Sequence, residues 1–166
     1  MNQLIKLIDN INEQVGKIAA WSTSLLVWLI CANVLMRYIF NTSFIWFGEL
    51  ETYFFAISFL LTGAYAFKHN SHVRVDLFYD KWSPKRKALV NLFGGILILI
   101  PWCTIAFWYC WEYAYKAFKV GEKSNQPGGL PALYILKFII VFGFALLLLQ
   151  AISNILKSIQ TIKSNN

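Results

Sequence analysis

Two carboxylates inside an apolar stretch are the residues of this chain whose positions most suggest chemistry. Glu49 and Glu51 interrupt an apolar run that extends from Phe44 to Phe67. Ionisable groups at membrane depth mark either a proton or cation relay or an ion pair that fixes a contact. Two residues rotate a helix by about 200°, so we expect at most one of the two carboxylates to face the helix bundle. Arg37 ends the preceding apolar run and is a candidate partner, and we favour the ion pair over the relay.

The histidines and cysteines give weaker signals. His69 and His72 are the only histidines, and they lie in a polar segment, where they cannot hold a haem between membrane helices. Asp76 beside them completes only a weak metal site. Three cysteines lie inside apolar runs without a CxxC motif or metal-ligand spacing: Cys31, Cys103 and Cys110. Buried thiols usually act as small hydrophobes, so we predict no catalytic residue, no metal site and no cofactor in this chain.

Four long apolar stretches must position these residues. We predict transmembrane helices over 18–40, 44–67, 88–112 and 131–157. A helix rises about 1.5 Å per residue and needs about 20 apolar residues to span the hydrocarbon core. Charged residues make up only 14% of the chain, against about 25% in soluble domains. We therefore predict an all-α polytopic membrane protein in which residues 1–166 form one membrane domain, with no room for a soluble catalytic domain.

The segments outside these stretches are assigned from amphipathicity. Apolar residues at alternating steps of four and three predict an interfacial amphipathic helix over 1–17, the alternative being a frayed end: Leu4, Ile8, Ile11, Val15 and Ile18. Residues 68–87 mix aromatic and basic side chains and are predicted to form a cytoplasmic loop that contacts membrane lipid. Residues 113–130 are predicted to form a periplasmic connection. Because the apolar pattern continues past Trp111, the third helix is expected to project beyond the membrane.

Local signals predict where helices start, bend and meet partners. Thr42 or Ser43 is expected to cap the second transmembrane helix, and Pro131 to lie in the first turn of the last. Pro101 removes a backbone donor inside the third helix and is expected to kink it. The polar and amphipathic residues that follow the third span are predicted to form an outward docking rim: Glu112, Tyr113, Lys116 and Lys119.

The distribution of charge predicts the orientation of the chain. With four spans, the two termini and residues 68–87 share one side of the membrane. That side carries ten of the 15 Lys and Arg residues and the other side five, so the positive-inside rule places both termini in the cytoplasm. The net charge of +7 lies in segments that flank apolar runs rather than along a basic groove, so no nucleic-acid partner is expected.

Few polar residues lie within the predicted spans. They are Asn33 in the first, Ser58 and Thr62 in the second, and Gln150, Ser153 and Asn154 in the last. A transport site needs several convergent polar groups near the middle of the membrane. This set is more consistent with hydrogen bonds between helices, so we predict no solute or sodium ligand in this chain.

The segment from Gly121 to Leu156 is the most specific part of the sequence. Its turn Pro127-Gly128-Gly129-Leu130-Pro131 accompanies three further motifs: Phe40-Asn41-Thr42-Ser43, Trp46-x-x-Glu49-Leu50-Glu51 and His72-Val73-Arg74-Val75-Asp76. Together, over nearly the whole chain, they resemble the small membrane (Q-type) subunit of tripartite ATP-independent periplasmic (TRAP) transporters. Many members of that family carry adjacent carboxylates after the tryptophan, whereas Leu50 separates them here. Of the two, Glu49 is the preferred candidate for a scaffold contact.

The resemblance implies a role in solute uptake at a bacterial inner membrane. Such a subunit pairs with a much larger membrane subunit that carries the transport domain and the sodium sites. A periplasmic binding protein delivers the solute, typically an organic acid or related carboxylate. The small subunit is expected to brace the scaffold of the large one and to help dock the binding protein. The candidate partner-interface residues are Arg37, Trp46, Glu49, Glu51, Glu112 and Lys116.

Two other function classes share this size and number of spans. A membrane anchor subunit of a redox enzyme normally carries buried histidines for haem or a quinone pocket, and no histidine lies in a predicted span. A self-contained small transporter needs a buried charge of its own to hold an ion or solute. Both are therefore less favoured than the transporter subunit.

Overall fold

The chain folds into long helices joined by short connections. The computed structural model describes residues 2–69, 79 and 82–164. The expected roles of His72, Asp76 and the motif around them therefore lie outside the described residues. The helices are α1 (Asn2–Ile39), α2 (Ile45–Lys68), α4 (Pro84–Gly94), the π-helical segment η1 (Gly95–Leu99), α5 (Ile100–Lys119) and α6 (Tyr134–Ser164).

Four membrane-spanning candidates are present among the described residues. They are α1, α2, the continuous helix from Pro84 to Lys119, and α6. This confirms the all-helical class and the four apolar helices predicted from the sequence. The third candidate continues to Lys119, as the apolar pattern past Trp111 predicted. The last begins at Tyr134, so Pro131 precedes the helix instead of lying in its first turn.

The prediction of a separate interfacial helix over 1–17 is wrong. One unbroken helix of 38 residues runs from Asn2 to Ile39, about 57 Å at 1.5 Å per residue, which exceeds the roughly 30 Å hydrocarbon core. No proline interrupts it. Of the predicted apolar stripe, Ile8 is buried at 4% exposure, whereas Leu4 and Ile18 are 49% and 68% exposed. The buried face begins with Ile5 and Ile8, continues with small and polar residues such as Asn12, and lies against other helices.

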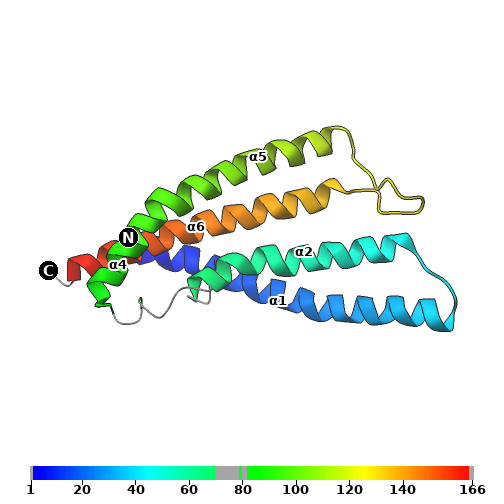
Figure 1. The fold of residues 1–166 in the computed structure, drawn as a ribbon, viewed down its shortest axis with the longest axis horizontal. Helices are drawn as coiled ribbons and strands as arrows, with labels where there is room; N and C mark the ends of the chain where they lie inside the picture. Colours follow the sequence, from blue (N-terminus) through cyan, green and yellow to red (C-terminus); the bar gives the residue numbers. More distant parts are fainter. Residues whose placement is uncertain (1, 70–78, 80–81, 165–166) are drawn as a thin grey trace.

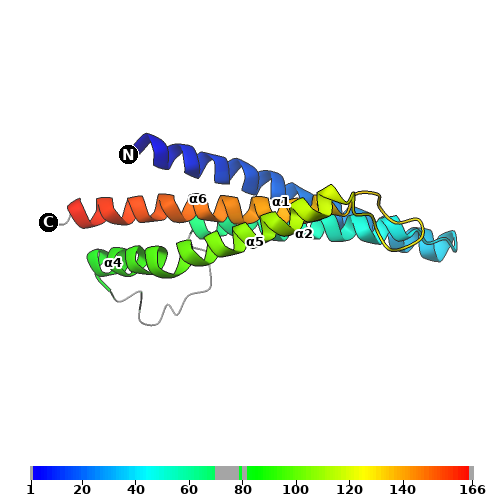
Figure 2. The same cartoon turned by 90° about the horizontal axis from the view of Figure 1, so that it is seen from above.

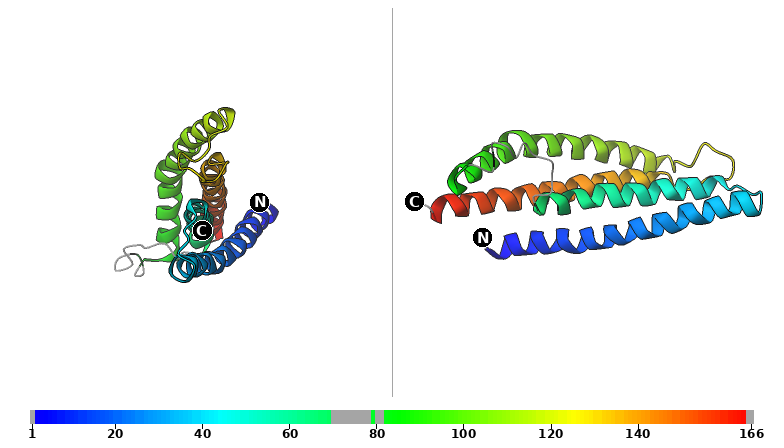
Figure 3. Two further views of the ribbon diagram at one scale, coloured as in Figure 1. Left: turned by 90° about the vertical axis from the view of Figure 1, so that its right-hand side faces the viewer. Right: turned by 60° about the horizontal axis from the view of Figure 1, so that its bottom comes forward.

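The four long helices form an open, curved layer instead of a closed bundle. The order across the layer is α5, α6, α2, α1, and each helix packs along the next (Figure 1). The first half of α1 also crosses to α6, next to the chain termini. Seen end-on, α5 and α1 lie at opposite edges (Figure 3). In the most apolar 18-residue stretch of α6, 33% of the residues are buried, against 6% in that of α2. Helix α6 is therefore the core helix of the layer.

Both ends of the layer are defined by connections. The turn at 40–44 and the loop at 120–133 lie at one end, which we call the loop end; the two termini and α4 lie at the other, the terminal end (Figures 1 and 2). Neither Thr42 nor Ser43 caps α2, contrary to the prediction. The N-cap residue is Phe44, without a side-chain hydrogen bond. The Thr42 hydroxyl instead donates to the Phe40 carbonyl oxygen at 2.9 Å and so stabilises the turn itself.

The third span bends where the sequence combines two glycines with a proline. Ser83 caps α4, and Pro84 occupies its first turn. The segment η1 widens the helix by one residue directly before Pro101, and the Ile100 amide donates to the Gly95 carbonyl oxygen. A π-helical turn supplies a different register of backbone hydrogen bonds, so it accommodates the missing proline donor. On the N-terminal side of η1, α4 lies against the C-terminal part of α6 (Figure 1).

Candidate functional site: polar clusters at the two ends of the helix layer

Glu49 is the anchor of the loop that connects α5 to α6. One carboxylate oxygen accepts a short hydrogen bond from the Ser124 hydroxyl, and the other accepts from the Leu130 amide at 2.5 Å. A side chain at Gly129 would collide with both Ser124 and Glu49, so glycine is needed for this close approach. Hydrogen bonds to an ionised acceptor are about twice as strong as neutral ones. Glu49 therefore fixes the loop on the N-terminal end of α2.

Further hydrogen bonds hold the same loop in place. The Tyr53 hydroxyl, one turn along α2 from Glu49, donates to the Ala132 carbonyl oxygen at 2.8 Å. Within the loop, the Ser124 amide donates to the Leu130 carbonyl oxygen at 3.0 Å. Positive φ angles of 60° at Gly121 and 79° at Gly128 allow the chain to reverse twice. The group Glu49, Tyr53, Ser124 and Leu130 is called the loop clasp below.

Glu51 and Arg37 do not form the ion pair expected from the sequence. Glu51 accepts a hydrogen bond at 2.7 Å from the Asn33 side chain of α1. Arg37 lies one turn further along α1, where it is exposed to the surroundings. The two carboxylates thus serve different neighbours, Glu49 the connecting loop and Glu51 helix α1. The rotation of about 200° between them agrees with this division.

Lys137 forms a part-buried ion pair that the sequence analysis missed. Its ammonium lies 2.5 Å from the Glu122 carboxylate and 3.8 Å from the centre of the Tyr113 ring, and the Lys137 side chain is 9% exposed. Glu122 is the one acidic residue in segment 113–130, and Lys137 is the one charge in the outer half of the last apolar run. That combination was a usable signal, because a lysine inside an apolar helix is rarely left without a partner.

The predicted docking rim is accessible at the end of α5. Lys116 and Glu112 form an exposed pair at 3.4 Å, with side chains 73% and 53% exposed. Tyr113 is also exposed, although its ring contacts Lys137. Trp46, at the start of α2, is 38% exposed and packs on Phe47 with ring centres 4.7 Å apart. These residues share the loop end of the layer, and their contact with a partner remains a prediction.

A second cluster, the terminal cluster, joins α1 to α6. Asp9 accepts hydrogen bonds from Lys157 at 2.7 Å, Ser153 at 2.8 Å and Gln150 at 3.2 Å. The Asn12 amide donates to the Gln150 side-chain oxygen at 2.7 Å, and both side chains are buried. Burial raises the pKa of Asp9, but the bonds from Lys157, Ser153 and Gln150 outweigh it, so its pKa is lowered.

Glu13 extends the terminal cluster from α1 to α2. Its carboxylate accepts from the Lys68 ammonium at 2.6 Å and from His69 Nε2 at 2.9 Å, and Lys17 lies 3.3 Å away. The bond from Lys68, followed by that from His69, lowers the pKa of Glu13 to about 2. Lys68 also donates to the Asp9 carbonyl oxygen at 3.1 Å. The first turns of α1 are therefore fastened to two helices by charge, outside the 18–40 apolar run.

The predicted hydrogen bonds between helices are confirmed for three of the six polar residues. Asn33, Gln150 and Ser153 bond to other helices. The hydroxyls of Ser58 and Thr62 donate to carbonyl oxygens of their own helix instead. In the part of the chain that the structure describes, no group of three or more His, Cys, Asp or Glu side chains is placed to hold a metal ion. The arrangement fastens helices and a loop together.

The comparisons with known proteins identify the family. Residues 26–161 match the family model of the DctQ component of tripartite ATP-independent periplasmic transporters, which covers well over half of the chain. No curated protein matches the chain. The match supports the transporter subunit over a redox-enzyme anchor, and the tripartite system implies a large membrane subunit and a periplasmic binding protein as partners. This chain, a multi-pass membrane protein without enzymatic function, therefore belongs to the DctQ family of TRAP transporter components.

Proposed function

We propose that the chain is the small permease subunit that braces the large transport subunit during sodium-coupled uptake. The solute is an organic acid or related compound delivered by the periplasmic binding protein. The solute and sodium sites lie in the large subunit, and this chain contributes shape and stiffness. The protein resides in a bacterial inner membrane with both termini in the cytoplasm.

The observation that carries this proposal is how the polar groups of the helices are used. Glu51 bonds to Asn33, Glu49 to the connecting loop and Asp9 to Lys157 and its neighbours, all within the chain. Among the described residues, a single buried side-chain atom, Asn12 Oδ1, lacks a hydrogen-bond partner. A transport site requires several convergent polar groups. A layer whose polar groups bond to one another is suited to bracing a partner.

The open layer also supports a bracing role. A closed bundle hides most of its apolar surface, whereas this layer leaves large side chains exposed on every helix, for example Trp28, Phe59, Trp108 and Phe142. Lipid or a neighbouring membrane subunit must cover them. At the loop end, Arg37, Trp46, Glu112 and Lys116 supply polar and aromatic groups for contact with the large subunit or the binding protein.

A substitution series in the assembled transporter tests the absence of a transport site here. Asn33, Ser58, Thr62 and Gln150 are each replaced by alanine, and sodium affinity is measured in proteoliposomes that hold the purified complex. The proposal expects an unchanged sodium affinity for every variant that assembles. A changed affinity in a fully assembled variant would place an ion ligand in this chain and contradict the proposal.

The orientation is tested separately. A reporter active only outside the cytoplasm is fused to the C-terminus, and a second fusion places it in the connection after Lys119. The charge distribution predicts activity for the second fusion alone. Activity of the C-terminal fusion would reverse the topology without affecting the family assignment.

A further inference from the structure

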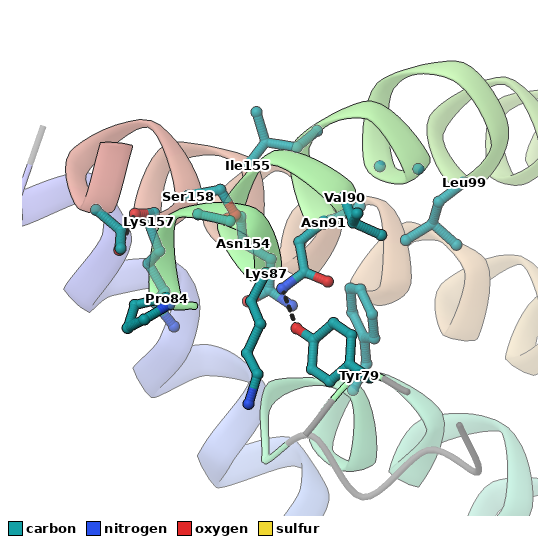
Figure 4. Close-up of a pocket in the computed structure, with 16 residues that line it drawn as sticks. Tyr79, Pro84, Lys87, Val90, Asn91, Leu99, Asn154, Ile155, Lys157 and Ser158 are labelled. Carbon is teal, nitrogen blue, oxygen red and sulfur yellow. Dashed lines mark hydrogen bonds between the residues drawn. The ribbon is translucent and has the colours of Figure 1, made fainter. Parts of the chain in front are cut away.

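A cavity at the terminal end has the form of a site for an amphiphile. It lies where α4 and η1 meet α6, with α2 and Tyr79 completing the wall, and has a volume of about 560 Å³. Pockets that hold small molecules usually measure about 300–1,000 Å³. The close-up shows Asn91 directed at Tyr79, with the Lys87 side chain extending along the same side (Figure 4).

The lining of this cavity changes from polar to apolar along the helices. Toward the helix ends it is lined by Lys87, Asn91, Asn154, Lys157 and Ser158. Because α4 and α6 run in opposite directions, the deeper residues of both helices meet further along. There the lining residues are Gly94, Gly95, Leu99 and Ala151. From Lys87 to Leu99 the helix rises about 18 Å.

The polar end is suited to an anionic group. Lys87 and Lys157 both line it; the Lys87 ammonium lies 5.1 Å from the centre of the Tyr79 ring, and the Lys157 ammonium is paired with Asp9 at 2.7 Å. Among the described residues, the amide nitrogen of Asn154 donates no hydrogen bond; only its oxygen is used, by Gln150. Ser158 donates its hydroxyl hydrogen to the Asn154 carbonyl oxygen, so it has no donor left for an anion. The two lysines and the Asn154 amide nitrogen favour a ligand group that accepts hydrogen bonds and carries negative charge.

The apolar end is open beside Gly94, whereas a Cβ on Gly95 would lie 2.9 Å from Ile155, so the space beside Gly95 is filled. A Cβ added to Gly94 would meet no atom within 4 Å, so the space beside it is open. The widened turn of η1 continues this wall toward the hydrocarbon core. A free anion would occupy the polar end alone and leave the apolar wall uncovered. A molecule with an acyl chain covers both, and basic pockets between membrane helices are known to take anionic lipid headgroups.

We propose that the cavity between α4, η1 and α6 binds one anionic phospholipid of the surrounding membrane. The lipid phosphate lies among Lys87, Asn154 and Lys157, and an acyl chain lies along Gly94 and Leu99. The inference is independent of the proposed transport role and of the orientation, since both leaflets of a bacterial inner membrane contain phospholipid.

Native mass spectrometry of the complex that contains the full chain tests this proposal. The delipidated complex is incubated with dioleoyl phosphatidylglycerol, with dioleoyl phosphatidylcholine, or with inorganic phosphate. We expect one retained phosphatidylglycerol. Removing one basic contact should lower its occupancy about fivefold, the weight of one basic residue at a membrane surface.

Three variants assign the retained lipid to this cavity. Lys87→Gln removes a cation, and Gly94→Leu fills the apolar end, while Lys163→Gln changes an exposed lysine at the same end of α6, outside the cavity lining. The first two should lower the occupancy of the lipid, Lys87→Gln by about fivefold, and the third should leave it unchanged. Equal retention in all four proteins, or equal loss with Lys163→Gln, would overturn the proposal. Retention of inorganic phosphate in place of the lipid would overturn the lipid assignment. If Gly94→Leu does not assemble, the comparison of lipid retention between Lys87→Gln and Lys163→Gln decides whether the cavity is the lipid site.

Discussion

Removing the Glu49 carboxylate should release the connecting loop between α5 and α6. Glu49→Ala deletes two acceptors, one used by the Ser124 hydroxyl and one by the Leu130 amide at 2.5 Å. A hydrogen bond to a charged group contributes about 1.5–3 kcal/mol. Because Glu49 is half-buried, hydrogen bonds to water replace part of this free energy once the loop opens. We therefore expect a net loss of about 3 kcal/mol in the free energy that keeps the loop closed.

Amide hydrogen exchange in the loop measures this loss directly. About 1.4 kcal/mol corresponds to a factor of ten in an equilibrium constant, so the amide of Leu130 should exchange roughly 100-fold faster in Glu49→Ala. Peptides covering 121–133 are followed by mass spectrometry in the purified complex. Glu49→Gln keeps an acceptor for Leu130 and loses only the charge, so its exchange should rise about fivefold.

Glu51→Ala provides the matched control. Glu51 lies two residues away on the same helix but bonds to Asn33 of α1, so its loss should change loop exchange by less than about threefold. If the loop amides exchanged as slowly in Glu49→Ala as in the unmodified protein, the loop clasp would not stabilise the closed loop. If Glu51→Ala opened the loop equally, the two carboxylates would not have the separate roles assigned to them.

Three further changes test the packing and the clusters, each by the melting temperature of the purified complex. Gly16→Ala places a Cβ 2.5 Å from the Tyr65 side chain and should cost about 1–3 kcal/mol, whereas Gly63→Ala, which meets no atom within 4 Å, should be neutral. Lys137→Met breaks a part-buried ion pair and should cost about 2 kcal/mol; a loss no larger than that of an exposed pair, below about 1 kcal/mol, would contradict its assigned role. Because its pKa is lowered from 4.5 to about 2, Glu13 stabilises the fold above pH 4.5 and loses this contribution as the pH falls toward 2. Glu13→Gln should remove that pH dependence.

The spans were predictable because hydrophobicity is a local property of the sequence. The second transmembrane helix, expected over 44–67, occupies Ile45–Lys68. The division between Glu49 and Glu51 was also within reach, since helix rotation alone separates them. The partners of Glu49 were not predictable from the sequence. Ser124 and Leu130 are about 80 residues away and reach Glu49 only through the shape of a glycine-containing loop.

The first helix shows where amphipathicity misleads. In water an apolar stripe marks the buried face, so Leu4, Ile8 and Ile11 were read as the side that meets the membrane surface. Near a bilayer the exposed side can itself be apolar, and helices meet through small and polar residues instead. In α1 the buried positions include Ile8 as well as Asn12 and Gly16, while Ile11 is 38% exposed. Asp9 and Asn12, which lie off that stripe, fasten α1 to α6.

The central claim is that this chain acts as the small partner in a tripartite transporter. Its most direct test is a pull-down of the tagged full chain from its native membrane in mild detergent, with mass spectrometry of the stoichiometric partners. The account predicts recovery of one much larger polytopic membrane subunit. Recovery of flavin or iron–sulfur subunits, or of the chain by itself, would contradict it.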